Sequence, residues 1–118
     1  MICEILSIGT ELLMGQVANT DAQYISRRLS ALGISVYHHT VVGDNVLRVK
    51  EALETALSRS DIVITTGGLG PTEDDLTKET VAEYLSLPLV MHDESLERIK
   101  KRIQGFGGVL TENNLKQA

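Results

Sequence analysis

The fold is decided by the stretch Asp61-Ile62-Val63-Ile64-Thr65-Thr66-Gly67-Gly68-Leu69-Gly70-Pro71-Thr72-Glu73-Asp74-Asp75, where an apolar run gives way to a glycine-rich loop. The run Ile62-Val63-Ile64 is apolar on both of its faces, which predicts a central strand of a parallel sheet. A helix predicted from about Leu76 to Leu85 follows, and its N-terminal N–H groups and dipole would face an anion held by the loop. The stretch therefore predicts a strand, a phosphate-binding loop and a helix in succession.

Strands and helices alternate on both sides of this stretch. Further strands are predicted over residues 2–8 and 34–42, and a short or edge strand at most over 87–91, because Pro88 interrupts it. Helices are predicted over 20–32, over 45–57 and from 93 to about 103, with Thr20, Asp44 or Asn45, and Asp93 as their respective caps. Residues 9–15 and 105–108 are predicted as loops, and Thr111 as the cap of a last helix. Strands 20 to 30 residues apart, joined by helices, predict an α/β fold with a mostly parallel sheet. With a helix only begun at Ala118, we expect residues 1–118 to be one domain that is truncated at its C-terminus.

Composition bears on the class of partner. The net charge is −5, so the chain has no surplus of cations to bind a phosphate backbone. It has three Tyr, one Phe and no Trp, and therefore few aromatic rings on which bases could stack. We therefore expect no nucleic acid as a ligand. No apolar run approaches the roughly 20 residues of a membrane span and no basic leader is present, so we expect a cytoplasmic protein without membrane contact. Cys3, the single cysteine, is predicted to be a buried strand residue.

Two loops are predicted to form one ligand crevice. Gly9-Thr10-Glu11 follows the first strand and the Gly67–Asp75 loop follows the third, and such loops converge if those strands are neighbours with the second strand outside the first. Glycines remove Cβ atoms where the backbone approaches a ligand or takes a positive φ, so Gly68→Val is expected to fill the anion's space without disturbing secondary structure. Asp74 and Asp75 beside a phosphate cradle indicate Mg²⁺ or a similar hard cation.

Structural interpretations of the same residues stay open. A Gly-Gly-x-Gly turn is often only a tight connection, and an Asp near a helix start is often a cap. Glu11 can be a solvated loop residue, and Asp44 and Asn45 can be helix caps. Lys100-Lys101-Arg102 is interpreted as an ordinary solvated helix face.

Four motifs in order carry a resemblance to a known family. Gly67-Gly68-Leu69-Gly70 followed by Asp75-Leu76-Thr77 resembles the signature of the molybdopterin-binding MoaB/MogA-like domains. Three further motifs resemble the CinA (competence-damage-inducible) branch of that family: the run from Ile8 to Gln16, Asn19-Thr20-Asp21-Ala22, and Val42-Gly43-Asp44-Asn45. Thr10 stands where the wider family has Asp, which fits the CinA branch better than a molybdopterin-binding member.

The resemblance implies a three-layer α/β/α fold and a nucleotide-type ligand. For the CinA branch it implies metal-dependent hydrolysis of ADP-ribose-type nucleotide pyrophosphates; the alternatives are binding or adenylylation of molybdopterin, and a non-catalytic interaction module. We expect a homo-oligomer, such as a dimer. The residues expected to be catalytic are Asp75, Asp74 and Glu11, with Asp75 as the metal ligand. Those expected to bind nucleotide or phosphate are Gly9, Thr10, Asn19, Asp44, Thr66, Gly67, Gly68, Gly70, Thr72 and Thr77.

Overall fold

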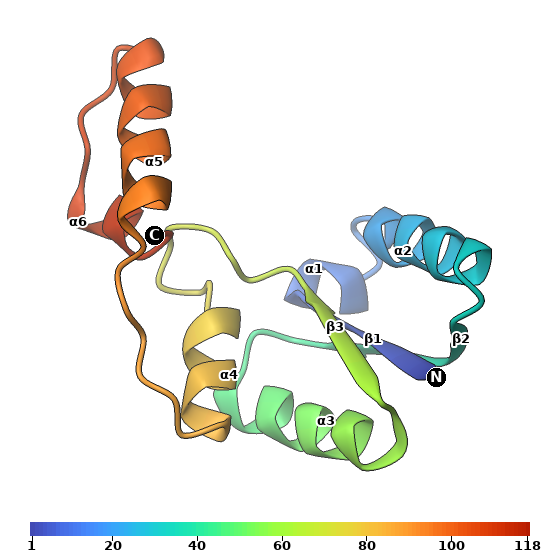
Figure 1. Ribbon diagram of the computed structural model, residues 1–118. Helices are drawn as coiled ribbons and strands as arrows, with labels where there is room; N and C mark the ends of the chain where they lie inside the picture. Colours follow the sequence, from blue (N-terminus) through green and yellow to red (C-terminus); the bar gives the residue numbers. More distant parts are fainter.

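The computed structural model describes all residues, 1–118, as three strands and six helices (Figure 1). Strands and helices alternate through most of the chain, as the spacing predicts. In chain order the elements are β1 (Ile2–Ile8), α1 (Thr10–Leu13), α2 (Thr20–Ala31), β2 (Ser35–Val42), α3 (Val46–Arg59), β3 (Ile62–Thr66), α4 (Thr77–Tyr84), α5 (Asp93–Gly105) and α6 (Glu112–Leu115).

The sheet is parallel and has the strand order β2-β1-β3. β1 is therefore the central strand, and six of its seven residues are buried. β3 lies at an edge with every residue half-buried, so the prediction that Ile62-Val63-Ile64 forms a central strand is wrong. The apolar pattern was misleading because two polar residues of the true central strand, Glu4 and Ser7, are buried with hydrogen-bond partners.

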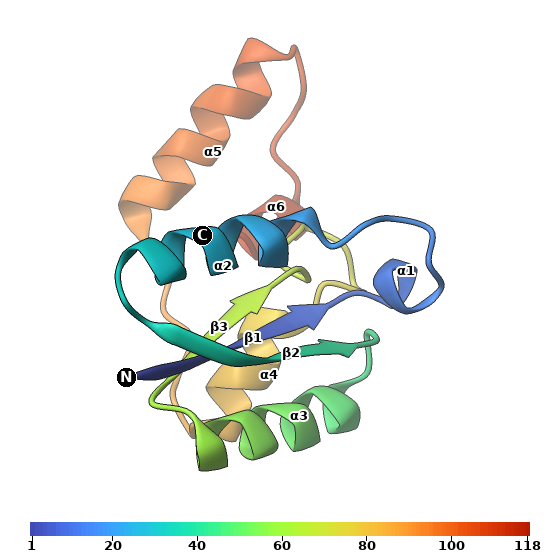
Figure 2. The same ribbon diagram turned by 90° about the vertical axis from the view of Figure 1, so that its right-hand side faces the viewer.

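Helices cover both faces of the sheet, which confirms the three-layer α/β/α arrangement (Figure 2). On one face Cys3 and Ile5 of β1 pack against Ala22 and Leu29 of α2. On the other face the buried side chains come from β1, the end of β2 and α3, and they are Leu6, Ile8, Val42, Val49 and Leu53. Val81 and Tyr84 of α4 pack against this cluster. Burial raises the pKa of the Cys3 thiol, and the neighbouring Glu4 carboxylate adds to this.

A buried carboxylate lies inside the central strand. The Glu4 side chain accepts hydrogen bonds from Arg59 Nε and Nη2 at 2.8 Å each and from Thr40 Oγ1 at 2.6 Å. These partners, the Arg59 guanidinium first, hold the pKa of the Glu4 carboxyl below its ordinary range. Through these bonds Glu4, Thr40 and Arg59 join β1, β2 and the end of α3. They do so at the point where the β1–β2 register shifts between Cys3 and Glu4.

Several helix ends differ from the prediction by one residue. Asn19, not Thr20, caps α2, because its side chain accepts from the Ala22 N–H at 3.2 Å. Asn45 caps α3, which settles the choice between Asp44 and Asn45 for that role. His92 caps α5 in place of the predicted Asp93.

One short segment differs from the prediction: residues 10–13, predicted as part of a loop, form the short helix α1. A single turn of helix is too local for an apolar pattern to show. No strand forms over residues 87–91, which agrees with the limit that Pro88 places on this exposed apolar run.

α5 stands away from the sheet (Figure 1), and none of its residues is buried. The chain then returns, so that the His92 N–H donates to the Ala118 carbonyl at 2.9 Å. Ile99 and Ile103 of α5 line a cavity together with Asn114 and Gln117 of the returning segment. None of the helices combines the length and apolarity that crossing a membrane requires.

Candidate functional site

The loops after β1 and β3 meet at the carboxyl end of the sheet, as the sequence predicts. Ser7 pairs with Thr66, so Ile8 and Gly67 continue side by side. Gly67 has φ +83°, and a Cβ atom there would lie 2.0 Å from the Ile8 carbonyl oxygen. This contact is possible only for glycine, and it closes the back of the crevice between the two loops.

Below this contact lies the first of two small cavities, the β1–β3 crevice of about 150 Å³, whose polar lining includes Glu11, Asn19, Asp21 and Thr66. The buried Ser7 hydroxyl joins its sides, because it accepts from Asn19 Nδ2 at 2.9 Å and from Thr66 Oγ1 at 3.2 Å. Asn19 and Thr66 are thus placed together, as predicted. Asp21, to which the sequence assigned no role, brings a second carboxylate beside Glu11.

The second cavity, which we call the glycine-loop cradle, lies on the other side of Gly67. It has a volume of about 150 Å³ and is lined by Gly68, Leu69, Gly70, Lys78, Glu79, Lys116 and Gln117. α4 begins here without a side-chain cap, so the N–H groups of its first turn have no side-chain acceptor. Uncapped N–H groups, a glycine backbone and two ammonium groups are the components of a phosphate site.

Thr77 holds the Gly67–Asp75 loop, which we call the glycine loop, against α4. Its hydroxyl donates to the Gly67 carbonyl at 2.7 Å, and its N–H donates to the Gly68 carbonyl at 3.2 Å. Gly68 has φ +65°, and a Cβ atom there would lie 2.1 Å from Thr77 Oγ1. The reason given for Gly68→Val is therefore wrong: the new side chain would collide with α4 before it reached any anion.

Asp75 folds back onto its own loop. Its Oδ2 accepts from the Thr72 N–H at 3.0 Å and from Thr72 Oγ1 at 2.7 Å. These bonds, and a further one from the Gly70 backbone, lower the pKa of the Asp75 carboxyl. Asp75 lines neither cavity, and Asp74 is exposed.

The first loop is tied to the loop after β2. The Thr10 N–H donates to Asp44 Oδ2 and the Asp44 N–H donates to Thr10 Oγ1, each at 3.1 Å. Thr10 and Asp44 therefore bond each other. Gly9, which follows β1, donates its N–H to the Val42 carbonyl. This pairing fixes the start of α1 and with it the position of Glu11.

A divalent metal in this site would need oxygen ligands from a bound phosphate as well as from the protein. The chain contains no group of three His, Cys, Asp or Glu side chains placed to hold a metal ion. Mg²⁺ is often bound by one or two carboxylates together with substrate phosphate oxygens, and the lone carboxylate of Asp75 beside the cradle fits that arrangement. The residues thus suit a cation that arrives with a phosphate ligand.

Lys116 lines the cradle, and the sequence analysis did not single it out. Its ammonium group donates to the Thr72 carbonyl at 2.6 Å and to the Asp75 carbonyl, and it lies 3.8 Å from Glu79 Oε1. The Lys78 ammonium group in turn donates to the Lys116 carbonyl. We call these contacts the lysine latch. They join residues 37 to 44 positions apart, so no local pattern indicates them.

Together, the parallel sheet and the paired loops define an α/β protein whose loops meet where the strand order reverses, the place at which ligands bind in sheets of this kind. Comparison with known proteins agrees. The family model described as the probable molybdopterin binding domain matches residues 4–115, and the chain belongs to that family.

Within the family, the chain is similar to CinA-like proteins. It is 64% identical to the CinA-like protein of Dictyoglomus thermophilum over all 118 residues, and it spans 29% of that relative's length. Among solved structures it resembles the protein CinA, of unknown function, from Thermoplasma acidophilum: the TM-score is 0.86 at 35% identity, over 98% of this chain and 67% of that one.

It also resembles the tungsten cofactor synthesizing protein MoaB of Pyrococcus furiosus, with a TM-score of 0.69 at 25% identity, over 94% of this chain and 69% of that one. These similarities confirm the MoaB/MogA-like fold and the resemblance to CinA.

Proposed function

We propose that the protein hydrolyses nucleotide pyrophosphates of the ADP-ribose type with the help of a divalent metal. The observation that supports this most is the cradle, where Gly68, the uncapped start of α4 and the ammonium groups of Lys78 and Lys116 surround one small cavity. A pyrophosphate carries the negative charge that such a cavity attracts. The similarity to CinA-like proteins, in which the family resemblance implies this activity, supports the choice of ligand.

In the proposed reaction a water oxygen forms a bond to one phosphorus, and the bridging P–O bond of the anhydride breaks. ADP-ribose and water thereby give AMP and ribose 5-phosphate. The backbone of the glycine loop and the two lysines hold the phosphates and offset their charge. The proton of the attacking water passes to a carboxylate, for which Glu11 at the β1–β3 crevice and Asp74 on the loop are the candidates.

Asp75 would hold the metal together with phosphate oxygens of the ligand. A bound divalent metal supplies neutralisation of phosphate charge and a lower pKa of bound water. The Asp75 carboxyl is suited to this role as an anion, and the hydrogen bonds from Thr72 lower its pKa further. The same bonds orient the side chain, so the metal position depends on the loop that binds the phosphates.

Asp75→Asn tests this proposal, because asparagine keeps the shape and one acceptor oxygen but not the charge. We expect turnover of ADP-ribose to fall by about 10²-fold or more while the protein stays folded. Hydrolysis is measured against Mg²⁺ concentration for both proteins. Asp93→Asn, at the exposed start of α5, is the matched control and should hydrolyse at the parent rate. Parental turnover of Asp75→Asn with the same metal dependence would show that Asp75 only shapes the loop.

Molybdopterin is the second candidate ligand, and the description of the matching family favours it. Both ligands carry phosphate, so the cradle alone does not separate them. Thermal-shift measurements with ADP-ribose, AMP and molybdopterin, each with and without Mg²⁺, decide between them. Stabilisation by molybdopterin alone would reject the pyrophosphatase proposal, and stabilisation by none would favour a non-catalytic interaction module.

A further inference from the structure

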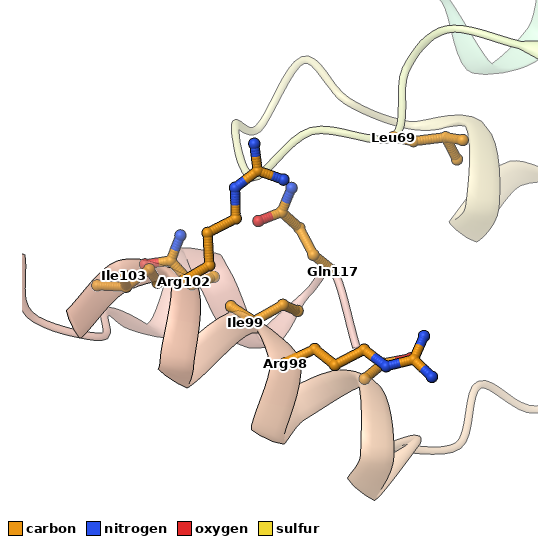
Figure 3. A pocket seen from close by; sticks show the side chains of 8 residues that line it. Leu69, Arg98, Ile99, Arg102, Ile103 and Gln117 are labelled. Atoms are coloured by element: carbon orange, nitrogen blue, oxygen red, sulfur yellow. The ribbon is translucent and has the colours of Figure 1, made fainter. Parts of the chain in front are cut away.

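A larger cavity lies between α5, α6 and the glycine loop, and we call it the arginine cavity (Figure 3). Its volume is about 450 Å³, three times that of the cradle. Two arginines one helical turn apart on α5, Arg98 and Arg102, contribute its only charged side chains. Arg102 is exposed, as expected for a solvated helix face, and its side chain also lines this cavity.

Two planar polar groups in this cavity have no partner in the chain. Arg98 bonds Glu94 on its own helix, but Arg102 forms no hydrogen bond or ion pair. The Gln117 amide is likewise free, so it offers both a donor and an acceptor. Figure 3 shows the Arg102 guanidinium group and the Gln117 amide extending from α5 and the C-terminal segment toward the glycine loop. Asn114 adds one amide donor, since its Oδ1 already accepts from Thr111.

The rest of the cavity wall is aliphatic. Leu69 lies on the glycine-loop side, and Ile99 and Ile103 lie on the α5 side. A bare phosphate would leave most of this volume empty and the aliphatic wall uncovered. A flat heterocycle suits it better, because guanidinium planes and aliphatic side chains both stack on bases, and amides bond base edges.

The arginine cavity also adjoins the cradle, because Leu69 and Gln117 line both. A ligand with its phosphates at the glycine loop can therefore extend a neighbouring group into the arginine cavity. In a nucleotide that group is the nucleoside. The order of the two cavities thus matches the order of groups in a nucleotide.

We propose that the arginine cavity is the nucleobase subsite, in which Arg102 stacks on the base and Gln117 bonds its edge. The inference rests on the proposed function for the position of the phosphates, but not for hydrolysis. It adds a specificity-determining role for two residues that lie outside the glycine loop. Because an amide offers one donor and one acceptor side by side, it matches the N6–H and N7 pair of adenine.

Paired probes test the subsite. AMP and ribose 5-phosphate both carry one phosphate on a ribose, but only AMP carries a base, and calorimetry gives the affinity of each. We expect the protein to bind AMP more tightly, and Arg102→Ala and Gln117→Leu each to weaken AMP about tenfold without changing ribose 5-phosphate. Arg27→Ala, at an exposed arginine of α2, is the matched control and should change neither affinity.

Other outcomes overturn the proposal in recognisable ways. Equal weakening of both probes by Arg102→Ala would make Arg102 a phosphate ligand. No preference for AMP in the parent, or no effect of either variant, would reject a base subsite. If ADP-ribose is not hydrolysed but the AMP preference depends on Arg102 and Gln117, only the hydrolysis proposal fails. If ADP-ribose is hydrolysed and the variants keep the AMP preference, only the subsite fails.

Discussion

Replacing Gly67 with alanine perturbs the contact that closes the back of the β1–β3 crevice. Two costs are expected. The residue has φ +83°, and an L-residue in the left-handed region costs about 1–2 kcal/mol. The new Cβ would also lie 2.0 Å from the Ile8 carbonyl oxygen, whereas Cβ atoms essentially never come closer than 3.0 Å. The loop must therefore withdraw from β1 by about 1 Å.

The second cost can be separated from the first. Gly33, which ends α2, has φ +72°, but a Cβ there meets no atom within 4 Å. Gly33→Ala thus carries the backbone cost alone. Overpacking of this kind costs about 1–3 kcal/mol, so Gly67→Ala should lose about 2–5 kcal/mol and Gly33→Ala about 1–2 kcal/mol.

Urea unfolding followed by circular dichroism measures both variants against the parent, and equal m-values verify that the same transition is compared. Calorimetry with AMP then tests the site. We expect Gly67→Ala to weaken AMP binding at temperatures where it is fully folded, and Gly33→Ala to leave it unchanged. Equal losses of stability in the two variants would refute the argument, because the clash with Ile8 would then contribute nothing.

Two further predictions concern Glu4 in the central strand and Thr77 at the start of α4. The pKa of the Glu4 carboxyl in the folded protein is below its ordinary value near 4.5. The contribution of the Glu4 carboxylate to the free energy of unfolding is therefore complete above pH 4.5 and is lost as the pH falls through the folded pKa. Glu4→Gln should therefore cost about 1.5–3 kcal/mol near pH 7, with the difference narrowing below pH 4.5 in urea unfolding; a constant difference would contradict this. Thr77→Val removes the hydroxyl that donates to the Gly67 carbonyl and should cost about 1–3 kcal/mol, whereas Thr77→Ser keeps the donor and should retain most of the stability.

The sequence predicted the order of elements and the meeting of the two loops, because both follow from short-range patterns. Strand spacing and helix periodicity are local, and the parallel connection rule then limits the strand order. The same reasoning misplaced the centre of the sheet. Apolar pattern ranks Ile62-Val63-Ile64 above β1, since it does not register that Arg59, 55 residues away, makes a buried Glu4 tolerable.

The site was predicted less completely than the fold. Glycine and threonine positions could be assigned because their roles depend on the loop itself, as with Gly67 at positive φ. Lys116 and Arg102 could not be assigned, because their position beside the loop depends on how residues 92–118 return to it. The roles of Asp75 in catalysis and of the metal stay predictions.

The lysine latch bears on the order in which the site can form during synthesis. The glycine loop is made about 40 residues before Lys116, yet the Asp75 carbonyl finds its partner only in that lysine. A nascent chain that has completed its three strands and α4 has the residues of the crevice, while its cradle still lacks Lys116 and Gln117. We therefore expect the proposed phosphate binding to begin only after Lys116 and Gln117 have returned to the loop.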